Sequence, residues 1–199
     1  MKQETARAEP ELRLTASAVH ALWELLSRGA SERQVVLGAM RARDDAFLRR
    51  VRWEANSYLR IRAAFEALVL GRTPGLLIGT EPAPVDCEDA IGLALFSAYA
   101  TSQIARLTLE AAGPRGAASE EAQGRLPVFR AARQYFHEAL GHDEAQVLAR
   151  ARALPVRDDP RAASRALVIQ GVLVRSEEEA YLAPDEEIAR VAAALANLS

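Results

Sequence analysis

The stretch that decides the fold class is CEDAIGLALFSAYATSQIARLTLEAA, residues 87–112. Drawn as a helix, it carries apolar side chains on most of its sides, namely Ile91, Leu93, Ala94, Leu95, Ala98, Ile104, Ala105 and Leu107. A helix that is apolar all round belongs in the interior of a folded domain. We therefore predict a long central buried helix here, with Asp86 as its N-cap and Asp89 three positions further on, near a capping-box pattern.

The segments on both sides of this stretch also space their apolar residues as helices do, and none alternates like a β-strand. The other predicted helices cover residues 12–27, 32–42, 41–72, 127–140, 142–154, 161–175 and 184–198. Gly29 is expected to end the first of them, and the second either continues into the third or bends near Asp44. The chain is thus predicted to be all-α, a single-domain bundle of about six or seven helices.

The remaining segments are predicted to flank or connect these helices. Residues 1–10 are expected to form a flexible N-terminus, which leaves the domain to residues 11–199. Residues 113–124 are rich in Gly, Ala, Ser and Glu and are expected to form a mobile linker. The long connection over residues 73–85 contains Leu-Leu-Ile, which predicts that it is pinned to the core.

Composition excludes several classes of protein. A chain of 199 residues, half of them apolar, suits one globular domain, and a net charge of -2 gives no global attraction to nucleic acid or anionic lipid. The single cysteine, Cys87, excludes an internal disulfide and a cysteine metal cluster. The longest apolar runs, residues 91–100 and 166–174, are too short to span a membrane.

The basic residues and the first residues of the chain indicate the kind of organism and the cellular compartment. Lys2 is the only lysine among 25 basic residues, a bias typical of GC-rich bacterial genomes. The N-terminal residues are polar and lack the apolar core of a secretory signal. We therefore expect a bacterial, cytoplasmic protein without a membrane partner.

The segment over residues 41–72 combines many arginines with one tryptophan. One face of this predicted helix is apolar, with Phe47, Val51, Ala55, Tyr58, Phe65 and Val69. The side turned away from it carries Arg41, Arg49, Arg52 and Arg60, with Trp53 beside them. Such a side is suited to bind nucleic acid, because guanidinium forks hold phosphate and an indole stacks on a base. The alternative, which needs no ligand, is that it docks the acidic segment over residues 177–187.

The other groups of chemically active residues in the sequence do not indicate a metal site, an activated thiol or a cofactor. His137, Glu138, His142, Asp143 and Glu144 are all able to bind metals, but the two histidines lie five positions apart across Gly141 and leave different helix faces. The neighbouring carboxylates oppose activation of the Cys87 thiol. Phosphate-binding loops, nucleophile elbows and dinucleotide fingerprints are absent from the sequence. We therefore predict no metal site and no cofactor.

Two runs of residues are similar to a known family. The first is an Ala-rich stretch that includes Asp89-Ala90-Ile91, Ala98-Tyr99-Ala100, Ala105-Arg106-Leu107 and Ala112-Gly113. The second is Arg175, Ala180-Tyr181 and Asp185-Glu186-Glu187, leading into the last predicted helix. The first resembles the second long helix of the HEPN superfamily, helical bacterial domains associated with nucleotides and RNA. The second is similar to the terminal region of its nuclease-dead members, and together they cover roughly residues 46–198.

The resemblance also implies candidate catalytic residues, Arg130 and His137. Catalytic HEPN members carry Arg-x(4–6)-His, paired across a dimer interface, and cleave RNA without a metal ion. Arg130 and His137 have this spacing and lie on one face of a predicted helix. The histidine would serve as acid or base and the arginine would stabilise charge on the phosphate. If residues 175–181 occupy the motif position instead, the domain lacks the histidine and is nuclease-dead.

Three functions follow as alternatives. The leading prediction is a non-catalytic binding or regulatory module, a HEPN-like adaptor or a toxin–antitoxin component, that forms a homodimer and takes a protein partner or RNA. The second is a metal-independent ribonuclease of the HEPN type that uses Arg130 and His137. The third is a nucleic-acid-binding protein that uses the arginine-rich helix.

Overall fold

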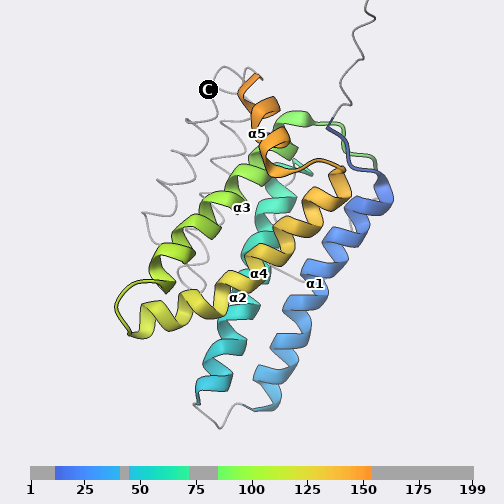
Figure 1. Ribbon diagram of the computed structural model, residues 1–199. Coiled ribbons are helices and arrows are strands. Elements are labelled where there is room, and N and C mark those ends of the chain that lie inside the picture. Colours follow the sequence, from blue (N-terminus) through green and yellow to red (C-terminus); the bar gives the residue numbers. More distant parts are fainter. Residues whose placement is uncertain (1–11, 41–44, 72–84, 154–199) are drawn as a thin grey trace, which may run out of the picture.

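The computed structural model describes residues 12–40, 45–71 and 85–153, and these residues form a bundle of α-helices (Figure 1). The helices are α1 (Ala16–Ala39), α2 (Ala46–Leu68), α3 (Ala90–Ala111), α4 (Ala117–Leu140) and α5 (Glu144–Ala153). The all-α prediction is confirmed. The described part contains five helices, and the two predicted over residues 161–175 and 184–198 lie outside it, as does the predicted connection over residues 73–85 except for Val85.

The helices pack as two antiparallel pairs. α1 lies along α2, α3 lies along α4, and α2 also contacts both α3 and α4 (Figure 1). α5 turns back from the end of α4 and packs against α3. This order places α2 and α3 inside the bundle and leaves one side of α4 exposed.

α3 is the central helix that its sequence predicts. Every residue from 91 to 100 is buried. The ring of Phe96 makes edge contacts with Phe65 of α2 at 5.5 Å and with Phe136 of α4 at 4.7 Å between centroids. Edge-to-face packing of this kind adds to the gain from burying the rings. α3 therefore joins the two pairs of helices through one aromatic cluster.

The N-cap of α3 is Asp89 rather than the predicted Asp86. The Asp89 side chain accepts a hydrogen bond from Gly92 N at 3.2 Å. Asp86 instead accepts from Ala16 N at 2.7 Å and from the Arg13 guanidinium. Beside it, Leu14 and Cys87 exchange two backbone hydrogen bonds of 2.9 and 2.8 Å. The Asp86 carboxylate thus accepts hydrogen bonds from residues at the start of α1. These residues lie too far from Asp86 in sequence for a local capping pattern to indicate the contact.

Asp86 gives the fold a predictable dependence on pH. The Arg13 side chain and the Ala16 N–H hold the pKa of the Asp86 carboxyl below its ordinary value of 3.8. A lowered folded-state pKa stabilises the fold above the unfolded pKa, and this contribution is lost as the pH falls through the folded-state value. We expect Asp86→Asn to lower the urea midpoint at pH 7, and the difference from the parent to shrink at about pH 3. An equal difference in urea midpoint between parent and variant at both pH values would show that the charge of Asp86 does not stabilise the fold.

α1 does not end at Gly29 as predicted, but continues to Ala39. A Cβ atom built on Gly29 would lie 2.5 Å from Cε1 of Tyr58, closer than side-chain atoms approach one another. The Arg33 guanidinium group lies over the Tyr58 ring, with its central carbon 4.8 Å from the ring centroid. Gly29 therefore permits the close approach of α1 and α2, and does not stop the helix.

α4 begins at Ala117, so the predicted linker over residues 113–124 is largely helix and Pro127 lies inside α4. Ala122, Gly124 and Leu126 are buried in this part of the helix, whereas Pro127 is exposed. A proline inside a helix costs about 3 kcal/mol, because it removes one hydrogen bond and crowds the preceding turn. Burial of the helix's inner side against α2 and α3 offsets that cost.

Candidate functional site

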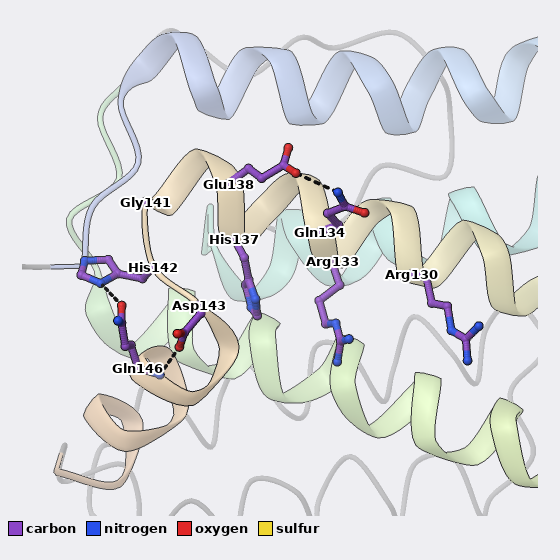
Figure 2. A pocket seen from close by; sticks show the side chains of 9 residues that line it. All are labelled: Arg130, Arg133, Gln134, His137, Glu138, Gly141, His142, Asp143 and Gln146. Atoms are coloured by element: carbon purple, nitrogen blue, oxygen red, sulfur yellow. Dashed lines mark hydrogen bonds between the residues drawn. The ribbon is translucent and has the colours of Figure 1, made fainter.

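An open cleft of about 680 Å³ follows the second half of α4 and the turn into α5 (Figure 2). Its walls include Arg130, Arg133 and His137 of α4, with His142 and Asp143 from the turn. The two predicted catalytic residues, Arg130 and His137, therefore line the same cleft. Arg133, which the sequence did not single out as a site residue, lies between them.

Arg130, Arg133 and His137 form what we call the α4 basic row. They occupy positions i, i+3 and i+7, which share one side of an α-helix over a length of about 10 Å. Figure 2 shows their side chains pointing the same way, toward α3. Arg130 is exposed, whereas Arg133 and His137 are half-buried. The row thus presents two guanidinium groups and one imidazole along a surface groove.

α3 orients two members of the row. Ser97 Oγ lies 2.8 Å from His137 Nε2, and Arg133 donates to Thr101 Oγ1 at 3.4 Å. Ser97 is fully buried, so its hydroxyl positions the imidazole and is not accessible to act as a nucleophile. Ser97 and Thr101 lie four positions apart in a mostly apolar helix, a spacing that marks one polar side of α3.

The cleft also carries hydrogen-bond acceptors. Glu138 accepts from Gln134 Nε2 at 2.8 Å, and Asp143 accepts from the Gln146 N–H at 2.8 Å. His142 Nδ1 lies 3.0 Å from Gln146 Oε1. Figure 2 shows Glu138 pointing away from α3, whereas Asp143 lies at the turn into α5, near the His137 end of the basic row. The described residues contain no group of three or more His, Cys, Asp or Glu placed to hold a metal ion.

The arginine-rich helix differs from its predicted arrangement. Arg52 is exposed and Arg49 half-buried, but Arg60 is buried, with 8% of its surface exposed. Phe47, predicted to face the core, is 57% exposed. The prediction assumed one covered side, whereas α2 contacts α1, α3 and α4, so its second half is buried nearly all round. Arg41 and the acidic segment over residues 177–187 lie outside the described residues.

Part of the predicted arginine surface lines a second cleft. It measures about 260 Å³ and lies between the first turns of α2 and those of α4. Arg49, Arg50 and Trp53 form its α2 wall, and Gln123 and Gly124 belong to the α4 wall. Arg52 and Arg60 are not among the residues that line it.

Comparisons of the chain with protein-family models, with curated proteins and with solved structures found no match. The resemblance to the HEPN superfamily therefore stays a prediction, and residues 175–187, which carry part of it, lie outside the described residues. Among the helices over residues 12–40, 45–71 and 85–153, none is both long and apolar enough to cross a membrane.

Proposed function

We propose that this chain is a bacterial helical module that binds the phosphate backbone of single-stranded RNA on the α4 basic row. The observation that carries the proposal is the convergence of Arg130, Arg133 and His137 on one open cleft. In this proposal the module is non-catalytic and acts in the cytoplasm as an adaptor or regulator.

The geometry of the row suits a polyanion. A guanidinium group donates two parallel hydrogen bonds to phosphate oxygens, and His137 adds an imidazole beside them. A row of about 10 Å is long enough for its side chains to contact more than one phosphate of a strand. Contact with Ser97 and Thr101 limits the freedom of His137 and Arg133, which reduces the entropy lost on binding.

The carboxylates of the cleft favour RNA over DNA. Glu138 points away from α3 and repels phosphate, which favours the backbone beside the basic row, and Asp143 lies at the His137 end of that row (Figure 2). The same carboxylates are able to accept hydrogen bonds from 2′-hydroxyl groups, which DNA lacks. We therefore expect an RNA strand to bind more tightly than the DNA strand of the same sequence.

The proposal is tested by fluorescence anisotropy with a short labelled single-stranded RNA. We expect the double variant Arg130→Ala/Arg133→Ala to bind at least about tenfold more weakly, because each charge-assisted hydrogen bond contributes more than 1.4 kcal/mol. The matched control is Arg28→Ala, which removes a 65% exposed arginine from α1 and is expected to leave the affinity unchanged. Equal affinity for parent and double variant would contradict the proposal.

A second candidate is metal-independent cleavage of the bound RNA. The specific observation that favours it is His137, whose imidazole reaches the cleft while Ser97 holds its Nε2 atom. In such a reaction an imidazole takes the proton of a 2′-hydroxyl, whose oxygen bonds to the adjacent phosphorus as the bond from phosphorus to the 5′-oxygen breaks. The products are a 2′,3′-cyclic phosphate and a 5′-hydroxyl, which gains its proton from water. Arg130 would stabilise the charge that develops on the phosphate. The homodimer is proposed with the non-catalytic module as well, and for this candidate the HEPN resemblance implies that Arg130 and His137 pair across its interface.

Incubation of RNA with the protein in the presence of a metal chelator decides between the two. If the chain is a ribonuclease, the parent cleaves, and His137→Ala lowers the rate by about 10²–10⁴-fold, the usual contribution of an acid–base group. His20→Ala on α1 is the matched control and should cleave at the parental rate. RNA that binds but stays intact, or cleavage that survives His137→Ala, removes this candidate.

A further inference from the structure

We propose that the cleft between α2 and α4 is a stacking subsite. In it the Trp53 indole stacks on a base of the same RNA strand that the α4 basic row binds. This inference rests on the proposed function for the identity of the strand. It concerns a different cleft, of about 260 Å³, and different side chains. The ligand class it assigns is a nucleotide with its base on Trp53 and its phosphate on the arginines.

Trp53 is fixed as a stacking platform by its packing on α4. A Cβ atom built on Gly124 would lie 2.9 Å from Cε3 of Trp53, so the indole lies directly against the α4 backbone. Trp53 lines the cleft and is only half-buried. A ring held on one side and exposed on another loses little freedom when a base stacks on it.

The walls of the cleft supply groups for the rest of a nucleotide. The Arg50 side chain is 62% exposed, and its Nε–H donates to Glu54 at 3.2 Å. Its two terminal amino groups add further donors, which suit a phosphate, and Arg49 lines the same wall. On the α4 wall Glu120 offers a carboxylate, the acceptor that suits the exocyclic amino group of a base.

One exposed side of α4 connects this cleft to the basic row. Gln123 lines the cleft, and Gln123, Pro127 and Arg130 are all exposed at intervals of four and three positions. This spacing keeps them on one side of the helix over about 10 Å. A strand bound at Arg130 is therefore able to continue along this side of α4 to the Trp53 cleft.

Tryptophan fluorescence tests the subsite directly. The chain has two tryptophans, so Trp23→Phe leaves Trp53 as the only one. We expect single-stranded RNA to quench Trp53 emission with the midpoint that anisotropy gives, and Trp53→Leu to weaken RNA binding about 5- to 100-fold. Because Trp23 is buried, the difference between parent and Trp53→Phe spectra replaces the single-tryptophan variant if that variant does not fold.

Two glycine substitutions form a matched pair for the same test. Gly124→Ala introduces a methyl group 2.9 Å from the Trp53 ring and is expected to displace it, which weakens RNA binding and reduces the quenching. Gly38→Ala adds the same group to α1, where nothing lies within 4 Å, and should leave both unchanged.

The outcomes separate the subsite from the proposed function. RNA binding without quenching, together with full affinity in Trp53→Leu, would overturn the subsite and leave the basic row intact. If the strand does not bind at all, the proposed function fails, and adenosine monophosphate then tests the cleft alone. Quenching of Trp53 by the mononucleotide would support the subsite, and its absence would overturn it.

Discussion

Replacing Glu66 with alanine is expected to lower the free energy of unfolding by about 3–5 kcal/mol, because it removes a carboxylate that pairs with a buried guanidinium group. The side chains of Arg62 and Glu66 are each only 3% exposed, with Arg62 Nε 3.5 Å from Glu66 Oε1. The same oxygen accepts from Trp23 Nε1 at 2.9 Å. One carboxylate therefore joins α1 to α2 in the core, where solvent does not screen its loss.

Urea unfolding followed by circular dichroism measures this effect. The matched control is Glu24→Ala, which removes an exposed carboxylate that pairs with Arg28 and is expected to cost at most about 1 kcal/mol. Glu66→Gln should lie between the two, because its amide oxygen still accepts from Trp23 while the charge is gone. A Glu66→Ala variant as stable as Glu24→Ala would mean that this buried pair does not hold the fold.

Gly29→Ala is expected to destabilise the protein by about 1–3 kcal/mol, the usual cost of forcing an additional methyl group into a packed contact. The new Cβ atom would meet three atoms of the Tyr58 ring at 2.5–2.7 Å. Gly38→Ala, in the same helix, is expected to stabilise the protein by about 0.5–1 kcal/mol, because alanine favours a helix and the site is open.

A double-mutant cycle identifies the source of this opposite behaviour. In a Tyr58→Ala background, Gly29→Ala should cost much less than it does in the parent, because the ring it meets has been removed. Thermal or urea unfolding of the four proteins supplies the coupling energy. Additive effects of the two substitutions would show that the close approach of α1 and α2 at Gly29 is not what limits the site.

The sequence predicts the parts of the fold that depend on local pattern. The continuous apolar character of residues 91–100 directly indicates a buried helix, and α3 is buried over that range. The predicted breaks at Gly29 and over residues 113–124 were wrong for a shared physical reason. Packing against α2 outweighs the low helix propensity of Gly29 in α1, and of Gly124 and Pro127 in α4.

In the candidate site, too, the sequence predicts what depends on local spacing and does not predict what depends on packing between helices. The seven-position spacing of Arg130 and His137 on one helix suffices to place them on one side, and the cleft contains both. Ser97 and Thr101 reach them from another helix, and only the pairing of α3 with α4 reveals that contact. The burial of Arg60 was unforeseen for a similar reason, since it depends on which helices surround α2.

The measurement that tests the central claim most directly is the salt dependence of RNA binding in the parent and in Arg130→Ala/Arg133→Ala. Single-stranded nucleic acid gives a slope of about -0.7 in log affinity against log salt for each phosphate that a protein neutralises. If both arginines of the α4 basic row contact phosphates, the slope of the double variant is shallower by about 1.4, while Arg28→Ala keeps the parental slope. Identical slopes for parent and double variant would contradict the account.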